Sequence, residues 1–277
     1  MRNKAVGLSP GLLGLERSDR MNILCIGDVV GSVGCQFLRE RLSGLKKLKA
    51  VDLVIANGEN SADGNGITPA ACKYLLDSGV DVLTGGNHSF RRKEAFDTYE
   101  SCETLLRPAN FPAKTTPGRG WCIIDMGRVQ AAVFNLMGTA FMENLRDPFD
   151  TMEEFLAIPD LPKIRIVDFH AEATGEKRAL GYFADGRISA IFGTHTHVPT
   201  ADDCILPLGT GYISDVGMTG PKESVLGVKP ELIIKKYREK LPVRFELAGS
   251  PCRMDCVLFT VDEKTGLCTA VERFSIL

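Results

Sequence analysis

Gly193-Thr194-His195-Thr196-His197 directly follows the apolar run Arg187-Ile188-Ser189-Ala190-Ile191-Phe192, and Pro199 comes two residues after it. The apolar run is typical of a buried strand, and the proline prevents a regular element from continuing. In an extended chain, two imidazoles at His195 and His197 are expected on the same side. Because two of the four histidines of the chain lie here, the stretch indicates a metal site, although a pair of exposed loop histidines is the competing interpretation.

The same pattern, an apolar run of strand length followed by polar side chains, recurs upstream. Five such strands are predicted over residues 22–27, 51–56, 80–84, 163–169 and 187–192. The polar residues that follow them are Asp28, Glu59 and Asn60, Asn87 and His88, His170, and His195 and His197. In open α/β sheets, ligands bind beyond the carboxyl ends of the strands, so these five segments are expected to converge. All four histidines belong to this set.

Helical patterns separate most of these strands. Helices are predicted over residues 35–47, 68–77, 147–157, 175–185 and 231–240, the second with Thr68 as N-cap and Pro69 at its first position. Further strands are predicted over residues 121–126, 130–136, 205–208, 211–214, 254–261 and 268–274, the first two forming a hairpin around Gly127-Arg128. The order β-α-β-α-β, hairpin, then βαβ predicts a layered α/β sandwich. We expect a flexible extension over residues 1–20 and a single domain over residues 21–277.

Composition narrows the class of protein. A net charge of −2 gives no general attraction to nucleic acids or anionic membranes, so neither is expected as a stable partner. No apolar run approaches the length of a transmembrane helix. Nine scattered cysteines favour reduced thiols and a cytoplasmic location. Cys252, Cys256 and Cys268 have no fourth ligand nearby, so they are interpreted as buried apolar cysteines and not as zinc ligands.

The residues at the strand ends suit metal chemistry. They offer carboxylate, amide oxygen and imidazole without thiolate, which favours a hard-to-borderline divalent cation such as manganese, iron or zinc. About seven ligands are too many for one tetrahedral zinc and suit two metals roughly 3.5–4 Å apart with a shared carboxylate. Such a pair activates water and binds the oxygens of a phosphoryl group, and it explains how a mildly acidic protein could hold an anionic substrate.

Each residue also has an ordinary structural interpretation. Asp28 could be a helix N-cap, and Asn60 and Asn87 could be turn residues, since each has a glycine nearby. His170 alone, at the end of an apolar strand, would more often be a core histidine. One metal site accounts for all of these residues together, and we therefore prefer it.

At this point the motifs resemble a known family. Gly27-Asp28, Gly58-Glu59-Asn60, Gly86-Asn87-His88, His170 and the 193–197 stretch resemble the calcineurin-like metallophosphoesterases in order and spacing. Further stretches are similar to the bacterial YmdB-like branch, namely Ile26-Gly27-Asp28-Val29-Val30-Gly31, Asp168-Phe169-His170-Ala171-Glu172 and Asp215-Val216-Gly217-Met218-Thr219-Gly220-Pro221. The resemblance extends from Met21 to the C-terminus and implies an αββα metallophosphoesterase sandwich with its metal site at the C-terminal ends of the strands.

The resemblance also implies a set of ligands. The usual first motif of the superfamily is Asp-x-His, whereas Asp28 here is followed by two valines, and Glu59-Asn60 stands where an aspartate is usual. The YmdB-like branch shares both changes. By resemblance, Asp28, Glu59, Asn60 and His197 would hold one metal, and Glu59, Asn87, His170 and His195 would hold the other. Iron or manganese is favoured, and zinc remains open.

His88 is then the imidazole that is not a ligand. Nearby cations disfavour its protonation and a bound phosphate restores it, so His88 suits the role of general acid, which is the proton-donor role in the family. The resemblance implies a phosphodiesterase for 2′,3′-cyclic nucleotides in which a metal-bridging hydroxide attacks phosphorus. The residues that bind the nucleotide are unknown, although the segment 215–221 is implied to be a substrate-facing loop; a structural turn is the alternative.

Two other functions remain to be separated, and a third is disfavoured by the order of the motifs. A broader phosphomonoesterase or nuclease could use the same residues, and a regulatory protein could bind a nucleotide or a partner with only incidental turnover. A TIM-barrel amidohydrolase also uses His-x-His, but after its first strand, whereas here the pair comes late in the chain. Homo-oligomerisation is left open by the sequence.

Overall fold

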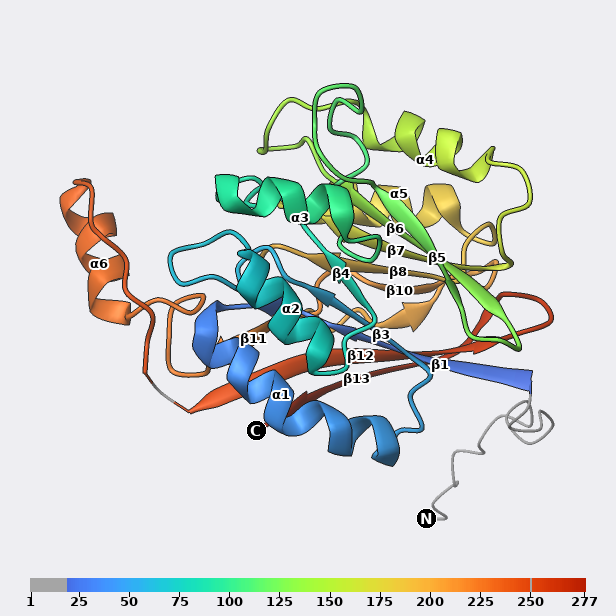
Figure 1. Ribbon diagram of the computed structural model, residues 1–277, viewed down its shortest axis with the longest axis horizontal. Coiled ribbons are helices and arrows are strands. Elements are labelled where there is room, and N and C mark those ends of the chain that lie inside the picture. Colours follow the sequence, from blue (N-terminus) through green and yellow to red (C-terminus); the bar gives the residue numbers. More distant parts are fainter. Residues whose placement is uncertain (1–18, 250) are drawn as a thin grey trace, which may run out of the picture.

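Two β-sheets lie face to face, with helices on both outer surfaces, in a computed structural model that describes residues 19–249 and 251–277 (Figure 1). The first sheet contains β1 (Arg20–Ile26), β2 (Asp28–Val29), β3 (Leu53–Asn57), β4 (Val82–Thr84), β11 (Met218–Pro221), β12 (Cys252–Asp262) and β13 (Cys268–Ile276). The second sheet contains β5 (Trp121–Asp125), β6 (Gln130–Met137), β7 (Ile164–His170), β8 (Ala190–Thr194), β9 (Cys204–Ile205) and β10 (Gly211–Ile213). The helices are α1 (Gly31–Leu48), α2 (Pro69–Asp77), α3 (Phe96–Ser101), α4 (Pro148–Leu156), α5 (Thr174–Ala184), α6 (Pro230–Glu239) and the short 3-10 helix η3 (Lys93–Ala95).

Three hydrophobic clusters lie between these layers and hold them together. The central cluster joins the inner faces of both sheets, for example Ile23 and Ile55 from one sheet with Ile166 and Phe192 from the other. A second cluster packs α1, α2 and α3 on the outer face of the first sheet, and a third packs α4 and α5 on the second. Along β1 the side chains alternate between the central and outer clusters, as a strand buried on both faces requires. The predicted αββα sandwich is therefore confirmed.

In both sheets, parallel strands bring the chain repeatedly to the same edge. β1, β3 and β4 are parallel neighbours in the first sheet, and β6, β7, β8 and β10 are parallel neighbours in the second. The strand order is β2-β11-β12-β1-β3-β4 in the first sheet, with β13 also paired to β12, and β5-β6-β7-β8-β10-β9 in the second. The carboxyl ends of these parallel strands carry the polar residues that the sequence singles out.

β12 joins three other strands of the first sheet. It pairs with β13 along much of its length, with β1 over its second half and with β11 at its start. The side chains of Asn22 and Thr260, joined by a 3.0 Å hydrogen bond, are 238 positions apart along the chain. The centre of the sheet is thus built from the two ends of the described chain.

Most predicted elements are present, with two informative differences. α1 begins at Gly31, although the sequence predicts a turn there and a helix only from residue 35. The glycine at position 34 is needed for packing, because a Cβ there would lie 2.4 Å from the carbonyl oxygen of Thr219 in β11. The segment α3 was not predicted, and its Tyr99 is fully buried against the outer face of the first sheet.

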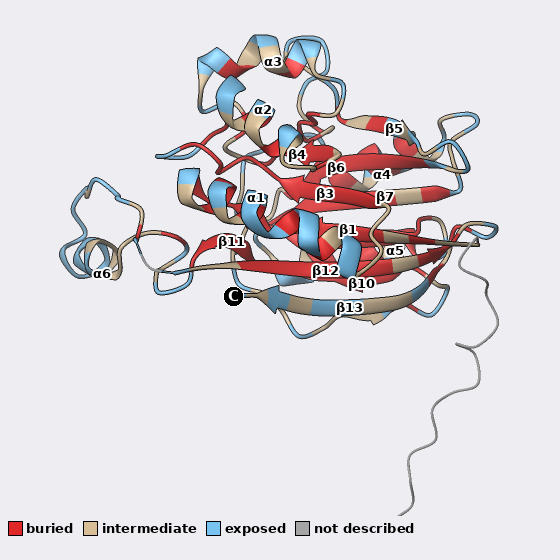
Figure 2. Ribbon diagram, turned by 60° about the horizontal axis from the view of Figure 1, so that its bottom comes forward, coloured by how far each residue is buried: buried red, intermediate tan, exposed pale blue. Residues whose placement is uncertain are grey.

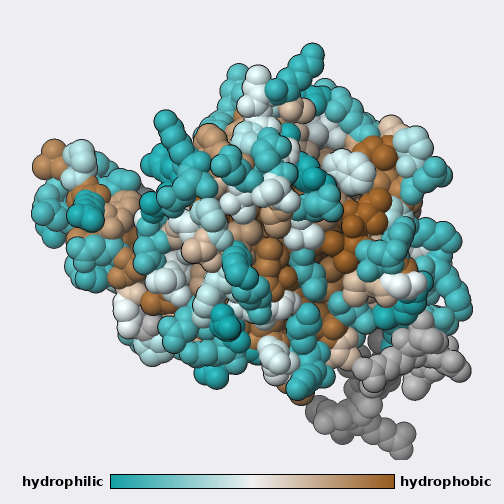
Figure 3. All heavy atoms as spheres, in the orientation of Figure 1, coloured by the Kyte–Doolittle hydropathy of each residue, from teal (hydrophilic) through white to brown (hydrophobic). Residues whose placement is uncertain are grey.

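The α6 segment stands away from the two sheets (Figure 1). None of its residues from Pro230 to Glu239 is buried, and Figure 2 shows it mostly exposed, whereas central strands such as β3 and β12 are largely buried. Apolar side chains lie among its charged ones, as Figure 3 shows, and Ile234 and Tyr237 are exposed. The predicted helix is therefore present, but it does not belong to the layered core.

The predicted extension over residues 1–20 lies almost wholly outside the described residues. β1 begins at Arg20, and the carboxylate of Asp19 contacts Lys264 at 2.9 Å. The division of the chain at residue 20 stays a prediction. Within residues 19–249 and 251–277, no helix has both the length and the apolar character required to cross a lipid bilayer.

Candidate metal centre

The eight residues predicted from the strand ends gather at one edge of the sandwich, in contact with one another. The first sheet supplies Asp28 from β2, Glu59 and Asn60 from the loop after β3, and Asn87 and His88 from the loop after β4. The second sheet supplies His170 from the end of β7, and His195 and His197 from the loop after β8. The contacts below join these five segments, as the positions of the strand ends predict.

One group of ligand atoms surrounds Nε2 of His170. This atom lies 2.9 Å from Oδ1 of Asn87, 3.1 Å from Nδ1 of His195 and 3.3 Å from Oε1 of Glu59. His170 and Glu59 are buried, so these atoms are largely withdrawn from water. The ligand atoms of Glu59, His170 and His195 all lie within 4.8 Å of one another, so small shifts of these side chains would place all three at roughly 2.1 Å from a common ion.

A second group surrounds the side-chain amide of Asn60. Its Nδ2 lies 3.1 Å from Oε1 of Glu59, 3.3 Å from Nε2 of His197 and 3.5 Å from Oδ1 of Asp28. Nε2 of His197 is itself 3.5 Å from Oδ1 of Asp28. A half-turn of the amide of Asn60 keeps its shape and presents the oxygen to these partners instead. The four side chains thus form a second set of carboxylate, amide and imidazole ligands.

Oε1 of Glu59 belongs to both groups. It is the atom that approaches His170 in the first group and Asn60 in the second. The donor set contains no thiolate, and hard-to-borderline divalent cations prefer this mixture of oxygen and imidazole nitrogen. The residues present therefore fit a pair of such cations with one carboxylate between them.

Electrostatics at the centre favour positive charge. Burial raises the pKa of the Glu59 carboxyl, but the neighbouring imidazoles of His170 and His88 together outweigh burial, and the net pKa lies well below its usual range. Burial lowers the pKa of His170, yet the carboxylates of Glu59 and Asp28 raise it to about 9. Burial lowers the pKa of His195 to about 4, with the charge on His170 acting in the same direction. The buried carboxylates thus favour positive charge at His170, which is the position where a bound cation would neutralise them.

The loop that carries the two histidines of the 193–197 stretch is not extended. β8 ends at Thr194, and His195 and His197 have φ angles of 104° and 61°, in the left-handed region that side-chain-bearing residues seldom adopt. The expectation that both imidazoles point to the same side of an extended chain is therefore wrong. The turn sends His195 to His170 and His197 to Asp28, so the pair divides between the two groups.

Hydrogen bonds behind the ligands fix the orientation of His170. Its Nδ1 lies 2.9 Å from the hydroxyl of Thr194, and that hydroxyl donates to Oδ1 of Asp168 at 2.7 Å. Asp168 also accepts from Asn57 at 3.1 Å, and burial raises its pKa to about 7. Nε2 of His170 is thereby directed at the ligand group. The sequence motifs include Asp168 and Thr194, but no sequence signal assigns them this supporting role.

Two motif glycines are required because other groups occupy the space of a side chain. A Cβ at Gly86 would lie 2.3 Å from Nε2 of His170 and 2.4 Å from Oε2 of Glu59. A Cβ at Gly193 would lie 1.8 Å from the carbonyl oxygen of Ser214. Both distances are far below van der Waals contact, so any side chain here would displace a ligand or its strand.

His88 lies beside the shared carboxylate. Its Nδ1 is 3.1 Å from Oε1 of Glu59 and 3.0 Å from Oδ1 of Asn60, and its backbone N–H donates to Oε2 of Glu59 at 2.8 Å. On the opposite side of the ring, Nε2 lies 3.5 Å from the side-chain amide of Asn65. The ring is partly exposed, and Nε2 is its edge away from the ligand groups. Asn65 was not predicted, because nothing in its sequence context places it near His88.

The segment 215–221 has a structural role, so the expected substrate-facing loop is wrong. Asp215 is buried, 2.7 Å from Nζ of Lys177 in α5, and accepts a hydrogen bond from the backbone N–H of Thr196. Residues Met218–Pro221 form the buried strand β11, which pairs with β2 and β12. This segment supports the histidine loop and the strand of Asp28 from behind.

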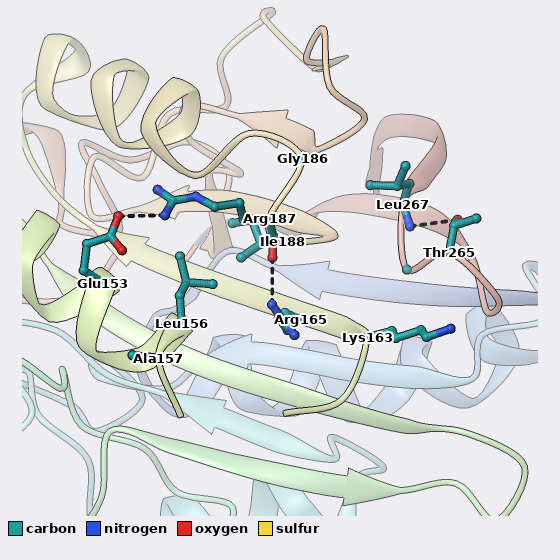
Figure 4. A pocket seen from close by; sticks show the side chains of 11 residues that line it. Glu153, Leu156, Ala157, Lys163, Arg165, Gly186, Arg187, Ile188, Thr265 and Leu267 are labelled. Atoms are coloured by element: carbon teal, nitrogen blue, oxygen red, sulfur yellow. Dashed lines mark hydrogen bonds and ion pairs between the residues drawn. The ribbon is translucent and has the colours of Figure 1, made fainter. Parts of the chain in front are cut away.

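A separate hollow of about 380 Å³ lies at the other end of the second sheet (Figure 4). It is lined by Lys163, Arg165 and Arg187, which precede β7 and β8 or lie near their starts. These cations are engaged within the protein, since Arg187 pairs with Glu153 and Arg165 donates to two backbone carbonyls. The hollow contains none of the predicted site residues. The cysteines also stay outside the centre. Cys256 and Cys268 are buried, as expected, whereas Cys252 is only partly buried, so the interpretation as a buried cysteine is wrong for that residue.

Comparisons with known proteins match nearly the whole chain. The family model described as YmdB-like protein matches residues 24–274. The 2′,3′-cyclic-nucleotide 2′-phosphodiesterase of Bacillus subtilis (strain 168) is 46% identical over 258 residues, which are 92% of this chain and 97% of that protein. A crystal structure of a novel phosphatase from Mycoplasma pneumoniae aligns with a TM-score of 0.88 and 34% identity over 93% of this chain and 94% of that one. A hypothetical protein from Thermus thermophilus aligns with a TM-score of 0.87 and 37% identity over 92% and 99% of the two chains.

Proposed function

The chain belongs to the YmdB-like protein family, and from this premise we propose that it is a metal-dependent phosphodiesterase that hydrolyses 2′,3′-cyclic nucleotides. The observation that carries the proposal is the pair of ligand groups that share Oε1 of Glu59, with His88 against the same atom. The similarity to the phosphodiesterase of Bacillus subtilis supports the substrate class, because it covers nearly the whole of both chains.

In this proposal, seven side chains hold two divalent cations. Asp28, Asn60 and His197 would hold one and Asn87, His170 and His195 the other, because these side chains form the two contact groups, and Glu59 would contribute to both. When bound, the metals supply an activated water and positive charge for the phosphoryl oxygens. Iron or manganese suits the donor set, and zinc is the third candidate.

Around the two cations, some side chains orient the ligands and His88 donates a proton. Thr194 and Asp168 keep Nε2 of His170 directed at the ligand group, so the geometry of the site is set before substrate arrives. His88, fixed at Nδ1 by the carboxylate of Glu59, has Nε2 at the accessible edge of its ring. A proton held on Nε2 is given to the oxygen that leaves phosphorus, which is general acid catalysis.

A substrate panel on protein purified without chelator tests the proposal. We expect metal analysis to find close to two divalent ions per chain, and hydrolysis of 2′,3′-cyclic AMP to be faster than that of p-nitrophenyl phosphate or single-stranded RNA. A faster rate on the monoester or on RNA would instead identify a phosphomonoesterase or a nuclease. Binding of the cyclic nucleotide without turnover would indicate a regulatory protein and would refute the enzymatic proposal.

A further inference from the structure

A cleft of about 720 Å³ lies between the loop after β3 and the segments that flank α6. Asn65 and Arg91 line one wall, and Arg244, Phe245 and Glu246 line the other. This volume is within the range of pockets that bind small molecules. None of these residues belongs to the two ligand groups of the metal centre.

Both walls of the cleft are connected to residues of the centre. On one wall, the amide of Asn65 reaches Nε2 of His88 at 3.5 Å, and Arg92 fixes this loop by donating to the carbonyl oxygen of Asn65 at 3.1 Å. On the other wall, the chain that leads into α6 contacts Nδ1 of His197 through the carbonyl oxygen of Leu226 at 3.2 Å. The cleft therefore adjoins the metal centre, and Asn65 joins the two at His88.

The acidic and basic side chains of the cleft differ in their hydrogen-bond partners. The acidic side chains have partners, since Asp63 accepts from the backbone N–H of Ser32 at 2.8 Å and Glu246 pairs with Lys229 at 2.7 Å. Arg91 and Arg244 are exposed, and neither guanidinium donates a hydrogen bond within residues 19–249 and 251–277, although Arg244 lies near enough to Glu246 to add to the effect of Lys229 in lowering the pKa of that carboxyl. Five donor N–H groups on each planar guanidinium are thus available to a ligand.

An aromatic surface accompanies these cations. Phe245 is 42% exposed although it lies in the cleft, and Nζ of Lys236 is 4.8 Å from the centre of its ring. An exposed ring between cationic groups is a surface on which a nucleic-acid base stacks, because every base has a π face and carries hydrogen-bonding edges.

We propose that this cleft binds the base of the nucleotide substrate, with Phe245 as the stacking surface and Arg91 and Arg244 as hydrogen-bond donors. The inference rests on the proposed function in one respect, the role of His88 as the acid for the leaving oxygen. In a 2′,3′-cyclic nucleotide the leaving oxygen stays on the ribose, and the ribose carries the base. The nucleoside must therefore extend past His88, toward Asn65 and the cleft.

Base recognition can be measured apart from catalysis by comparing two cyclic diester substrates, one with a base and one without. 2′,3′-cyclic AMP carries a base, and glycerol 1,2-cyclic phosphate has the same five-membered cyclic diester without one. For Phe245→Ala we expect the ratio of kcat/KM on cyclic AMP to that on the glycerol diester to fall about ten-fold, mainly through KM, since stacking on one base contributes roughly that much or more. Arg244→Ala should lower the same ratio, and Phe245→Trp should restore it.

Tyr237→Ala is the matched control, because Tyr237 is an exposed aromatic residue of α6 outside the cleft. It should leave the ratio unchanged. An equal loss in Tyr237→Ala and Phe245→Ala, or an unchanged ratio in Phe245→Ala, would overturn the proposal.

A binding measurement keeps this test independent of turnover. Adenosine should bind the wild-type and Tyr237→Ala proteins in saturation-transfer NMR and bind Phe245→Ala at least ten-fold more weakly. Adenosine binding that is equal in all three proteins would contradict the cleft. If the wild-type protein binds adenosine in this way but hydrolyses neither diester, the proposed function fails while the base site stands.

Discussion

At the scale of single residues, the centre depends on two histidines in unfavourable backbone conformations. His195 and His197 both have positive φ, and such residues cost of order 1–3 kcal/mol each. The surrounding structure holds the turn, because the backbone N–H of His195 donates to Oδ2 of Asp28 at 3.0 Å and that of Thr196 donates to Asp215. Because the backbone adopts this strained turn, two histidines that are only two residues apart reach different ligand groups.

His88 gives the sharpest prediction at this scale. In His88→Ala we expect metal content to stay at the wild-type level and kcat on 2′,3′-cyclic AMP to fall about 10²–10⁴-fold, the usual contribution of a general acid. The loss should be much smaller on a p-nitrophenyl diester, because its leaving group needs no proton. Steady-state kinetics together with metal analysis measure both effects.

The exposed Lys93, five residues after His88 and at the start of η3, provides the control variant Lys93→Ala, which should behave as wild type. Unchanged turnover in His88→Ala would remove His88 from the mechanism. Loss of metal in that variant would show that His88 acts as a ligand and not as an acid.

At the scale of elements, helix α5 holds the histidine loop in place. Nζ of Lys177, almost fully buried, contacts Oδ2 of Asp215 at 2.7 Å and donates to the carbonyl oxygen of Thr194 at 2.8 Å. Asp215 in turn accepts the backbone N–H groups of Thr196 and Gly217. One buried ion pair therefore connects α5, the end of β8 and the segment before β11.

Breaking this pair should affect stability and the site together. Lys177→Met leaves the Asp215 carboxylate buried without its partner, so we expect the free energy of unfolding to fall by about 3–5 kcal/mol. Urea unfolding followed by circular dichroism measures the change. Arg178→Met, on the same helix with a partly exposed side chain, should cost no more than about 1 kcal/mol. Equal losses in the two variants would show that the buried pair has no special role.

The elements that the sequence predicts correctly are those whose pattern is local. Thr68 caps α2 and Pro69 begins it, as expected, because N-cap chemistry involves only neighbouring residues. The polar residues at the strand ends were predicted to converge for a similar reason, since parallel strands end at a common edge.

The remainder depends on partners that are distant in sequence. The two-residue strand β2 is defined by its pairing with β11, which itself pairs with β12, and the first turn of α1 packs against β11 at Gly34 and Thr219. The turn at His195 is fixed by Asp28, and the contact of Asn65 with His88 joins two loops. Periodicity and local propensity contain no information about such contacts, so the sequence could not supply them.

At the scale of the whole molecule, the centre joins the two sheets. Each proposed metal would bind residues of both: Asp28 and Asn60 from the first sheet with His197 from the second, and Asn87 from the first with His170 from the second. The central hydrophobic cluster joins the same two sheets further inside. Metal binding and the packing of the sandwich are therefore expected to be linked.

This linkage predicts an effect of metal removal on stability. A ligand present at 100–1,000 times its Kd stabilises the folded state by about 2.7–4.1 kcal/mol, so chelation should lower Tm by roughly 5–10 °C. Differential scanning calorimetry with and without chelator measures the shift, and Asp28→Asn should show a smaller one. A chelated protein that has lost its metals but keeps its Tm would contradict the linkage.

The central position of β12 has a consequence for the order in which the protein becomes functional during translation. All seven proposed ligands precede residue 198, whereas β12, the partner of β1, begins at Cys252. At about 5–20 residues per second, the ribosome completes the last ligand seconds before it completes the strand that closes the first sheet. A nascent chain that already contains every ligand thus still lacks the C-terminal strands that complete the first sheet, the sheet that positions Asp28 and Glu59. Metal loading should therefore follow release of the C-terminal strands from the ribosome.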